Sequence, residues 1–282
     1  MKTSTQMVLR AFLNTSSADL AQYLSPDEKQ ALESLPESYG DPLSDLSEDL
    51  LRDIHFSWMS PFLRTLSEKD IGLFIAALNP SQAATVAKDL LYSGEIPPLT
   101  PTGKNYLQTT LLDHLTTEQE DLLPLSLLPK SPLNILLELK PETVSLLLSF
   151  LGLHDFAIEM KQIIEKQKLN KIYEALSPPQ LNYLKILLQS SEPVTFAPMG
   201  LNQWNGDQEK LRALLLQRSA NRLGKALFGQ DPSFIWHLLH KLPMDQALLV
   251  KKLSAPLENS RAAAILISQI LEFLSYTRQE NE

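Results

Sequence analysis

The feature that most constrains this fold is a short helix-start signal that recurs along the chain. Each copy has a leucine, then a residue that can cap a helix, with an acid or amide shortly after it. Two copies lie close together, at Leu66–Asp70 and Leu78–Gln82. The caps are Ser67 and Asn79, whose side chains can accept hydrogen bonds from the first turn, and at the second copy a glutamine can close a capping box. The pattern predicts a hairpin of two short helices over residues 62–91.

Further copies of the signal, some of them degenerate, occur on both sides of this hairpin. They begin at Leu24, Leu115, Leu139, Leu176 and Asp231. Helices this short are not stable alone in water, so neighbouring hairpins must cover one another. The spacing between copies is irregular, which excludes a strict repeat array. We therefore predict an all-α fold, an irregular, armadillo-like stack of short helical hairpins with a C-terminal helical subdomain.

Composition supports a helical chain with a substantial core. Hydrophobic residues make up 44% of the 282 positions, which argues against global disorder, and leucine dominates them. The run Glu192–Phe196 is the only candidate strand. The predicted regions are an N-terminal helical region (1–91), a proline-rich loop (92–104), a central helical region (105–188), a connecting segment (189–208) and a C-terminal helical region (209–282).

Three stretches carry more specific expectations. The first, Leu50–Leu66, is predicted to be a helix broken at Pro61. The second, His154–Leu176, is predicted to be one amphipathic helix, and the third, 189–208, to be a non-helical break that packs on the helical body. The expected buried side of the second contains Phe156, Ile163, Ile164, Ile172 and Tyr173, and the apolar residues of the third are Phe196, Met199, Leu201 and Trp204.

Charge and cysteine content limit the function classes. The net charge is −8, with an acidic front and a mildly basic back, so no nucleic acid is expected as a partner. The chain has no cysteine, which excludes disulfides and thiolate chemistry. Arg10 interrupts the only apolar run near the start, so no signal peptide is predicted, and no run of about 18 apolar residues occurs. These features predict a soluble, cytoplasmic protein.

Two groups of residues are candidate metal ligands, an acidic cluster and a pair of histidines. An acidic cluster comprises Asp41, Asp45, Glu48, Asp49 and Asp53. Its spacing lacks the pattern of a calcium loop, and acids are favourable in the first turn of a helix. His237 and His240 can share a helix face, but zinc needs further ligands. We expect one of these histidines to pack in the core and the other to face water, and we predict no metal.

Motifs that would carry catalysis do not occur in the sequence. The glycine patterns of phosphate-binding loops and of nucleophile elbows are missing, and no spacing selects a Ser-His-Asp triad. The sequence therefore predicts a protein that is not an enzyme, with no catalytic residues and no cofactor.

Two stretches resemble known families. Leu66–Leu91 resembles the short armadillo-like units of the flagellar rotor switch protein and of the magnesium-transporter regulatory domain, although the charged torque helix of the switch protein is not visible. Arg222–Leu242, RLGKALFGQDPSFIWHLLHKL, resembles the C-terminal part of the K component of the bacterial type III secretion sorting platform (the SctK/YscK family). The second resemblance implies a cytoplasmic, helical, non-enzymatic protein that links the inner-membrane ring to the pods.

The resulting functional prediction is an adaptor or scaffold of a type III secretion machine. Its partners would be membrane-ring and pod components, reached at the inner face of the inner membrane through protein contacts only. The alternative is a helical chaperone or regulatory domain that binds a peptide or helix of a secreted partner. An enzyme ranks third. The predicted partner-binding residues are Trp204, Arg218, Arg222, Trp236, His237 and His240, with core packing as the competing interpretation for Trp204 and Trp236.

Overall fold

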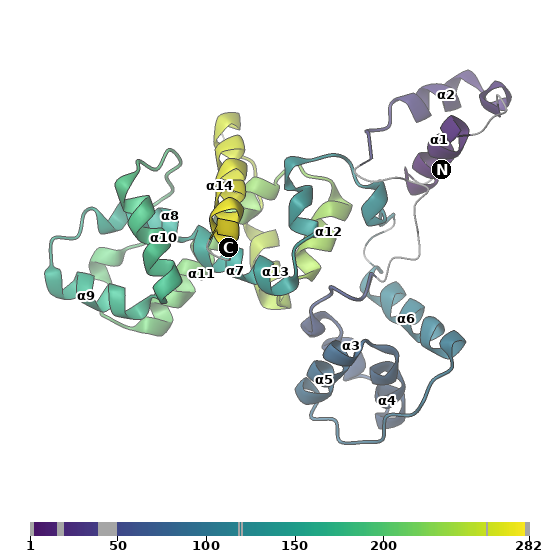
Figure 1. The fold of residues 1–282 in the computed structure, drawn as a ribbon, viewed down its shortest axis with the longest axis horizontal. Helices are drawn as coiled ribbons and strands as arrows, with labels where there is room; N and C mark the ends of the chain where they lie inside the picture. The colour runs from purple at the N-terminus through teal and green to yellow at the C-terminus, as the bar shows by residue number, and fades with distance from the viewer. Residues whose placement is uncertain are drawn as a thin grey trace. The chain divides into compact units, whose positions relative to one another are not determined.

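The structure, a computed structural model, describes residues 3–15, 20–38, 50–117, 119, 121–257 and 259–279. Within these residues the protein is all-α, with fourteen α-helices, five short 3-10 helices and no strand (Figure 1). The all-α prediction is confirmed, whereas armadillo-like stacking stays a prediction. The candidate strand Glu192–Phe196 is irregular backbone. Four members of the acidic cluster (Asp41, Asp45, Glu48 and Asp49) lie outside the described residues.

The chain divides into two compact units that are interleaved in sequence. Unit 1 comprises Met1–Pro141 and Gln230–Met244, and unit 2 comprises Glu142–Gly229 and Asp245–Glu282. The backbone therefore passes from one unit to the other three times. The stretch that resembles the secretion component, Arg222–Leu242, includes the second of these passages.

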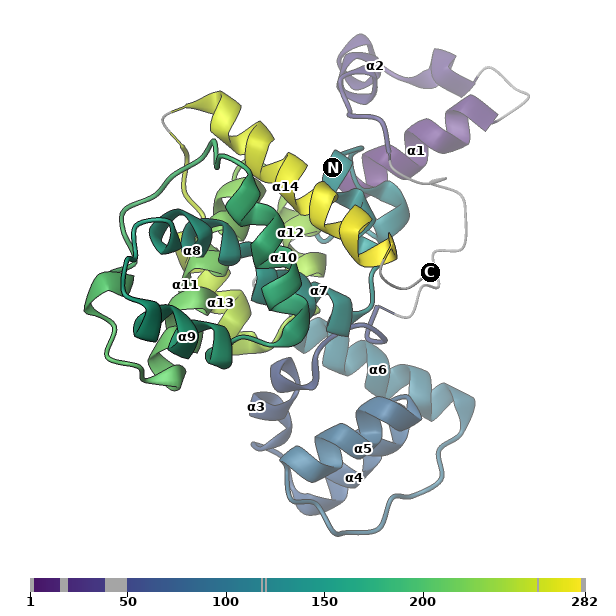
Figure 2. The same ribbon diagram turned by 60° about the vertical axis from the view of Figure 1, so that its left-hand side comes forward.

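Unit 1 contains short helices separated by turns. Its N-terminal part holds α1 (Thr3–Thr15), η1 (Leu20–Tyr23) and α2 (Pro26–Glu33). The blue helices of Figure 2 follow, and α4 packs against both α5 and α6. The remaining elements are η2 (Phe56–Trp58), α3 (Ser60–Leu63), α4 (Glu68–Ala77), α5 (Pro80–Asp89), α6 (Pro101–Leu115), η3 (Leu125–Leu127), η4 (Pro132–Leu137) and α12 (Pro232–His240).

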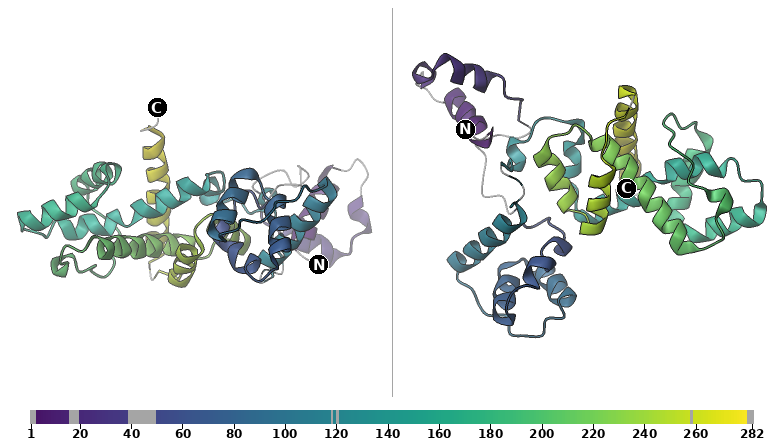
Figure 3. Two further views of the ribbon diagram at one scale, coloured as in Figure 1. Left: turned by 90° about the horizontal axis from the view of Figure 1, so that it is seen from below. Right: turned by 180° about the vertical axis from the view of Figure 1, so that it is seen from behind.

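Unit 2 contains the two longest of the described helices, at 20 residues each. Its elements are α7 (Pro141–Leu151), α8 (Leu153–Met160), α9 (Lys166–Ala175), α10 (Pro178–Gln189), η5 (Leu201–Gln203), α11 (Gln208–Leu227), α13 (Met244–Leu253) and α14 (Ser260–Gln279). Figure 3 shows α14, in yellow, crossing the green helices, and α14 packs against α11. Contacts of α8 with α10 and α11 complete the core of this unit.

The central hairpin forms as α4 and α5, and both predicted caps are present. The Ser67 hydroxyl accepts a hydrogen bond from the Asp70 N–H (3.3 Å), and the Asn79 carbonyl oxygen accepts one from the Gln82 N–H (2.9 Å). The capping box predicted for Gln82 does not form. Its Oε1 accepts from the side-chain amide of Asn79 (2.6 Å) and not from the Asn79 backbone N–H, while its Nε2 donates to the carbonyl of Leu51 (2.6 Å).

The other helix-start signals are confirmed with one exception. Helices begin after Ser25, Lys140, Ser177 and Asp231, and complete capping boxes form at Ser25 and Ser177. At Leu115 the prediction is wrong, since α6 ends there with Thr116 as its C-cap.

Two helix boundaries in unit 1 differ from the prediction. Residues 50–66 form no continuous helix, because the short α3 begins at Ser60, with Pro61 in its first turn, and a separate 3-10 turn precedes it. The predicted loop 92–104 ends early, because α6 begins at Pro101 with the Thr100 hydroxyl accepting from the Gly103 N–H (3.1 Å). Proline at the first helical position after a threonine cap is a favourable start.

In unit 2 the predicted helix over His154–Leu176 is two helices, α8 and α9. Phe156, Ile163 and Ile172 are buried as expected, but Ile164 is 93% exposed and Tyr173 is 37% exposed. The buried residues of α8 cover nearly its whole surface, whereas α9 buries only Ile172. Tertiary packing of this kind overrides helical periodicity, and a turn between the helices lets each meet different neighbours.

One helical stretch, Pro141–Met160, is long and apolar enough to cross a membrane by length and composition. Sequence inspection did not single it out, because its apolar residues are not consecutive. Of its residues 67% are buried within the protein, as expected for the core helix of a folded unit. It is therefore weak evidence for a membrane span.

Candidate functional site

The predicted site residues of α12 form part of the interior of unit 1. The His240 ring is stacked between two indoles, with centroid distances of 4.0 Å to Trp58 and 3.9 Å to Trp236. His237 Nε2 lies 2.7 Å from the carbonyl oxygen of Leu123. Both histidines are 7% exposed, so the expectation that one of them faces water is wrong.

His237 is held as a neutral donor. A carbonyl oxygen can only accept, so Nε2 must carry the proton that it shares with Leu123. Burial lowers the pKa of His237 to about 4, although the hydrogen bond to Leu123 opposes this effect. His237 and His240 thus have different partners, and the described residues contain no group of three His, Cys, Asp or Glu that could hold a metal ion.

Sequence inspection missed the buried lysine that follows these histidines. Lys241 is 3% exposed, and its ammonium group lies 3.0 Å from Asp53 Oδ2 and 2.8 Å from the Leu139 carbonyl. It also donates to the carbonyl of Leu137. Burial of a lysine is tolerated when its charge is paired and its donors are satisfied. Asp53, assigned to the acidic cluster from sequence, therefore acts as the counter-ion of Lys241.

In unit 2 Arg222 is the centre of a buried ionic network. It is 1% exposed and binds Asp155 through two nitrogens, at 3.2 Å and 2.8 Å. It also donates to Glu192 (3.3 Å) and Gln269 (2.7 Å). The guanidinium fork suits this bidentate arrangement. The network joins α8, α11 and α14 to the segment that follows α10.

The same network extends from Glu192 to a histidine and a tyrosine. Glu192 Oε2 lies 2.6 Å from His154 Nδ1, and His154 Nε2 lies 3.1 Å from the Tyr183 hydroxyl. Burial raises the pKa of the Glu192 carboxyl, but the hydrogen bond from His154 and the charge of Arg222 outweigh it and hold the pKa at about 2. Burial, and then the charges of Glu272 and Glu192, raise the pKa of Tyr183. These side chains are buried in unit 2 and satisfy one another's hydrogen-bonding groups.

Residues 190–204, here called the strap, form most of the break predicted between helices. Four Lys and Arg side chains donate hydrogen bonds to its backbone carbonyls, at positions four residues apart. The pairs are Lys161 with Ser190, Arg222 with Val194, Arg218 with Pro198 and Lys168 with Asn202. The Glu159 carboxylate accepts the N–H groups of Met199 and Leu201. Trp204 is 7% exposed and its Nε1 donates to the Asp207 carbonyl (2.7 Å), so the predicted internal packing is confirmed.

The six predicted partner-binding residues therefore occupy two separate places. Trp204, Arg218 and Arg222 belong to unit 2, and Trp236, His237 and His240 belong to unit 1. Four of them are buried, while Trp236 and Arg218 are half-buried. Their role in partner binding stays a prediction.

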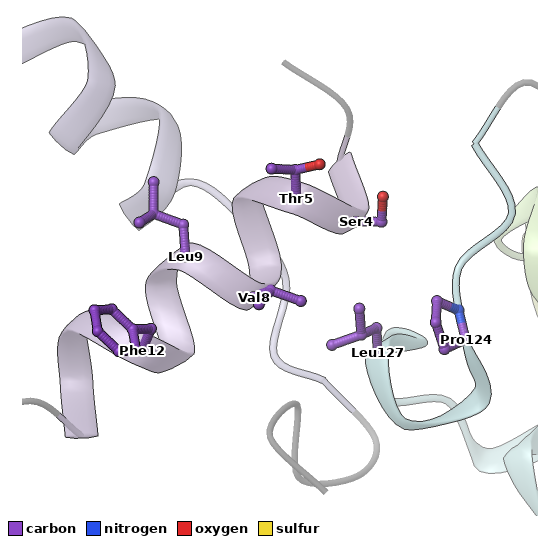
Figure 4. A pocket seen from close by; sticks show the side chains of 7 residues that line it. All are labelled: Ser4, Thr5, Val8, Leu9, Phe12, Pro124 and Leu127. Carbon is purple, nitrogen blue, oxygen red and sulfur yellow. The ribbon is translucent and has the colours of Figure 1, made fainter. Parts of the chain in front are cut away.

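The surface of unit 1 carries a groove that sequence inspection did not find. It lies along α1 beside η3, is open to solvent with a volume of about 530 Å³, and has Val8 facing Leu127 (Figure 4). Its lining consists of Ser4, Thr5, Val8, Leu9, Phe12, Pro124 and Leu127. Most of the lining is apolar, and such a concave surface can accept apolar side chains. The only sign of the groove in the sequence is the helical spacing of residues 4, 8 and 12. The opposite wall, η3, is more than a hundred residues away in the sequence and could not be paired with them.

A second hollow lies in unit 2 and has a different character. Its volume is about 370 Å³, and α7, α10, α11 and α13 contribute to it. Polar groups line much of it, among them Ser145, Ser149, Gln180, Arg212 and Gln246. Each unit thus contributes a hollow from its own described residues, apolar in unit 1 and mixed in unit 2.

Comparison of the chain with protein-family models, curated proteins and solved structures identifies no match.

Proposed function

We propose that the protein is a non-enzymatic adaptor of a bacterial type III secretion machine, which links the inner-membrane ring to the cytosolic sorting platform. It works in the cytoplasm and reaches the membrane only through protein partners. The resemblance of Arg222–Leu242 to the K component supplies the secretion part of this proposal. It carries no cofactor and no metal in this role.

The observation that carries the adaptor role is the presence of a separate hollow in each unit. A linker must hold two partners at once, and the two hollows differ in chemistry, so they suit different partners. The titratable groups at the centre of each unit also favour a binding function. His154, His237 and Arg222 are enclosed and satisfied by internal hydrogen bonds, an arrangement that rigidifies a scaffold.

Affinity capture after crosslinking in the cells that make the protein tests the adaptor role. The expected result is recovery of both membrane-ring and pod components of one secretion apparatus. A variant altered in the unit 1 groove should no longer capture one of the two classes of component but should still capture the other. A variant altered in the unit 2 hollow should show the reverse pattern. Recovery of neither class would contradict the proposal.

The alternative, a chaperone or regulatory domain, is favoured by the apolar groove alone. A groove along one helix is a common way to bind an amphipathic helix or peptide. In the capture experiment this function predicts recovery of a single secreted substrate in place of the ring and pod components.

A further inference from the structure

We propose that Asn205 is a site of spontaneous deamidation, and that the folded turn around it promotes the reaction. The turn joins the strap to α11 within unit 2, and the inference does not depend on the adaptor function. Three features of the turn carry it: the glycine that follows Asn205, the hydrogen bonds of the asparagine side chain and of the backbone, and a lysine beside them.

Glycine directly follows Asn205 in the sequence. Asn205 alone among the eleven asparagines of the chain has this neighbour. Gly206 has no side chain to hinder an approach to its nitrogen, and its φ of 96° is a conformation that other residues rarely adopt. Asn205 is exposed, so water reaches its amide. The Gly206 nitrogen can therefore attack the Asn205 side chain and close a five-membered ring, as suits two groups held close together.

Hydrogen bonds prepare the Asn205 side chain for this attack. Its Oδ1 accepts the Asp207 N–H (3.2 Å), which closes a turn with Gly206 at its centre. Ring closure places negative charge on this oxygen, and a backbone N–H that points at it stabilises that charge. The hydrogen bonds among the described residues include none donated by the Gly206 N–H, so the nitrogen loses no partner when it attacks.

A cation lies beside the same peptide bond. The Lys171 ammonium is 3.7 Å from the position that a Cβ on Gly206 would occupy. Attack requires the Gly206 nitrogen to release its proton, and a neighbouring positive charge favours the anion that results. Lys171 lies on α9, so it is brought to the turn only by the fold. An unfolded chain of the same sequence lacks this help.

The reaction needs water as its only co-reactant. The Gly206 nitrogen gives its proton to solvent and forms a bond to Asn205 Cγ. The bond from Cγ to the side-chain nitrogen then breaks, and that nitrogen takes up a proton and leaves as ammonia. Water opens the resulting succinimide at either of its two carbonyls. One opening gives aspartate, and the other gives isoaspartate, in which the backbone runs through the former side chain.

Isoaspartate would lengthen the backbone between two points that are fixed. Trp204 is buried, and its Nε1 donates to the Asp207 carbonyl (2.7 Å), which closes the turn across Asn205. The Asp207 carboxylate caps α11 by accepting the N–H groups of Glu209 and Lys210. An additional backbone carbon atom misaligns these hydrogen bonds. The attachment of the strap to α11 should therefore weaken as the chain ages.

Ageing of the full chain in mildly alkaline buffer tests the inference. Methyl transfer from S-adenosylmethionine by a protein isoaspartate methyltransferase measures the product, and peptide mass mapping locates it. We expect isoaspartate at Asn205 to form at least as fast in the folded chain as in the chain unfolded by guanidinium chloride, because the turn brings the reacting groups together. Asn202 is the internal control, since it is also exposed but is followed by glutamine.

Matched variants separate the effect of the fold from that of the sequence. Lys171→Gln should slow the reaction by about twofold or more, because the positive charge is lost from the turn. Lys166→Gln is the control, since Lys166 is an exposed lysine of the same helix and the charge change is the same. Asn205→Gln should form no isoaspartate at this position. Circular dichroism checks that the variants remain folded.

Two outcomes would overturn the inference. The first is slower formation of isoaspartate in the folded chain than in the unfolded chain, because the turn would then protect Asn205. The second is the same rate in Lys171→Gln and Lys166→Gln, because the fold would then contribute no charge to the reaction. Neither outcome bears on the adaptor function, which is measured by capture of ring and pod components.

Discussion

At the scale of single residues, the interior of unit 2 depends on the pairing of charges. Arg222 forms ion pairs with both Asp155 and Glu192 in the interior, and it also donates to Gln269 and to the backbone of Val194. Removing one member of a buried ion pair leaves the others charged and unpaired, which costs more than the pair contributes. Arg222 was predicted to contact a partner, but this environment also gives it a structural role.

Arg222→Met should therefore lower the free energy of unfolding by roughly 3–5 kcal/mol, measured by denaturant titration. Arg212→Met is the matched control, because Arg212 lies on the same helix in an exposed pair with Glu209 (3.0 Å). Exposed pairs contribute about 0–1 kcal/mol. Equal losses in both variants would contradict the role assigned to the network.

The protonation of His237 predicts a second effect at this scale. Its pKa falls from 6.5 when unfolded to about 4 in the folded chain. His237 therefore binds a proton more readily in the unfolded chain than in the folded one. Its contribution to the free energy of unfolding is complete above pH 6.5, where it is neutral in both states, and is lost as the pH falls towards 4. The loss should be about 3 kcal/mol at most.

Unfolding free energies measured across this pH range test the effect. His237→Gln should be less stable than the unaltered chain at pH 7 and should lose less stability between pH 6.5 and 4. If the two pH profiles run parallel, His237 is not the group responsible.

At the scale of elements, the helix starts were the most predictable part of the structure. Caps are local in sequence, so Ser25, Asn79 and Ser177 could be assigned from a few neighbours. The start of α6 was missed because Leu99-Thr100-Pro101 lacks the acid or amide of the other copies. Leu115-Thr116 is followed by Glu118 and Gln119, yet α6 ends there. The division of His154–Leu176 into two helices depends on tertiary packing and was not predictable from periodicity.

The cap of α5 gives a direct test at this scale. Asn79→Ala should destabilise the protein by about 0.5–2 kcal/mol, because the first turn loses its side-chain acceptor and Gln82 loses a neighbour. Ser81→Ala, in the exposed first turn of the same helix, should leave the melting temperature nearly unchanged. An unchanged melting curve for Asn79→Ala would show that the cap is not formed.

At the C-terminal end of α5 a substitution is expected to stabilise the protein. Leu91 has a positive φ of 53° and is 89% exposed. This backbone conformation is unfavourable for leucine by about 1 kcal/mol and is readily adopted by glycine. Leu91→Gly should raise the free energy of unfolding, whereas Leu90→Gly, one residue earlier at negative φ, should lower it. A loss of stability in Leu91→Gly would contradict this interpretation.

At the scale of the whole molecule, the candidate sites could not be predicted because they join distant segments. Asp53 and Lys241 are 188 residues apart in sequence, and Ser4 and Asp121 are 117 apart. No local sequence pattern marks either residue of these pairs. The apolar spacing of residues 4–12 was visible, but only the folded chain shows that η3 lies beside it.

The placement of α12 predicts how fragments of the chain behave. A fragment ending at Gly229 lacks the partners of Trp58 and Asp53, so residues 50–115 should be cleaved faster by protease than in the full chain. A fragment ending at Leu253 restores these contacts and should be protected in that region. Equal protection in both fragments would mean that residues 50–115 are stable without α12.

The three passages between the units also set an order for biosynthesis. The first 141 residues leave the ribosome long before α12, yet unit 1 is complete only when Met244 has emerged. At about 5–20 residues per second, the wait of about a hundred residues lasts some 5–20 seconds. During this interval the apolar surface that later receives Trp236 and His240 is uncovered, so newly made chains should be clients of nascent-chain chaperones.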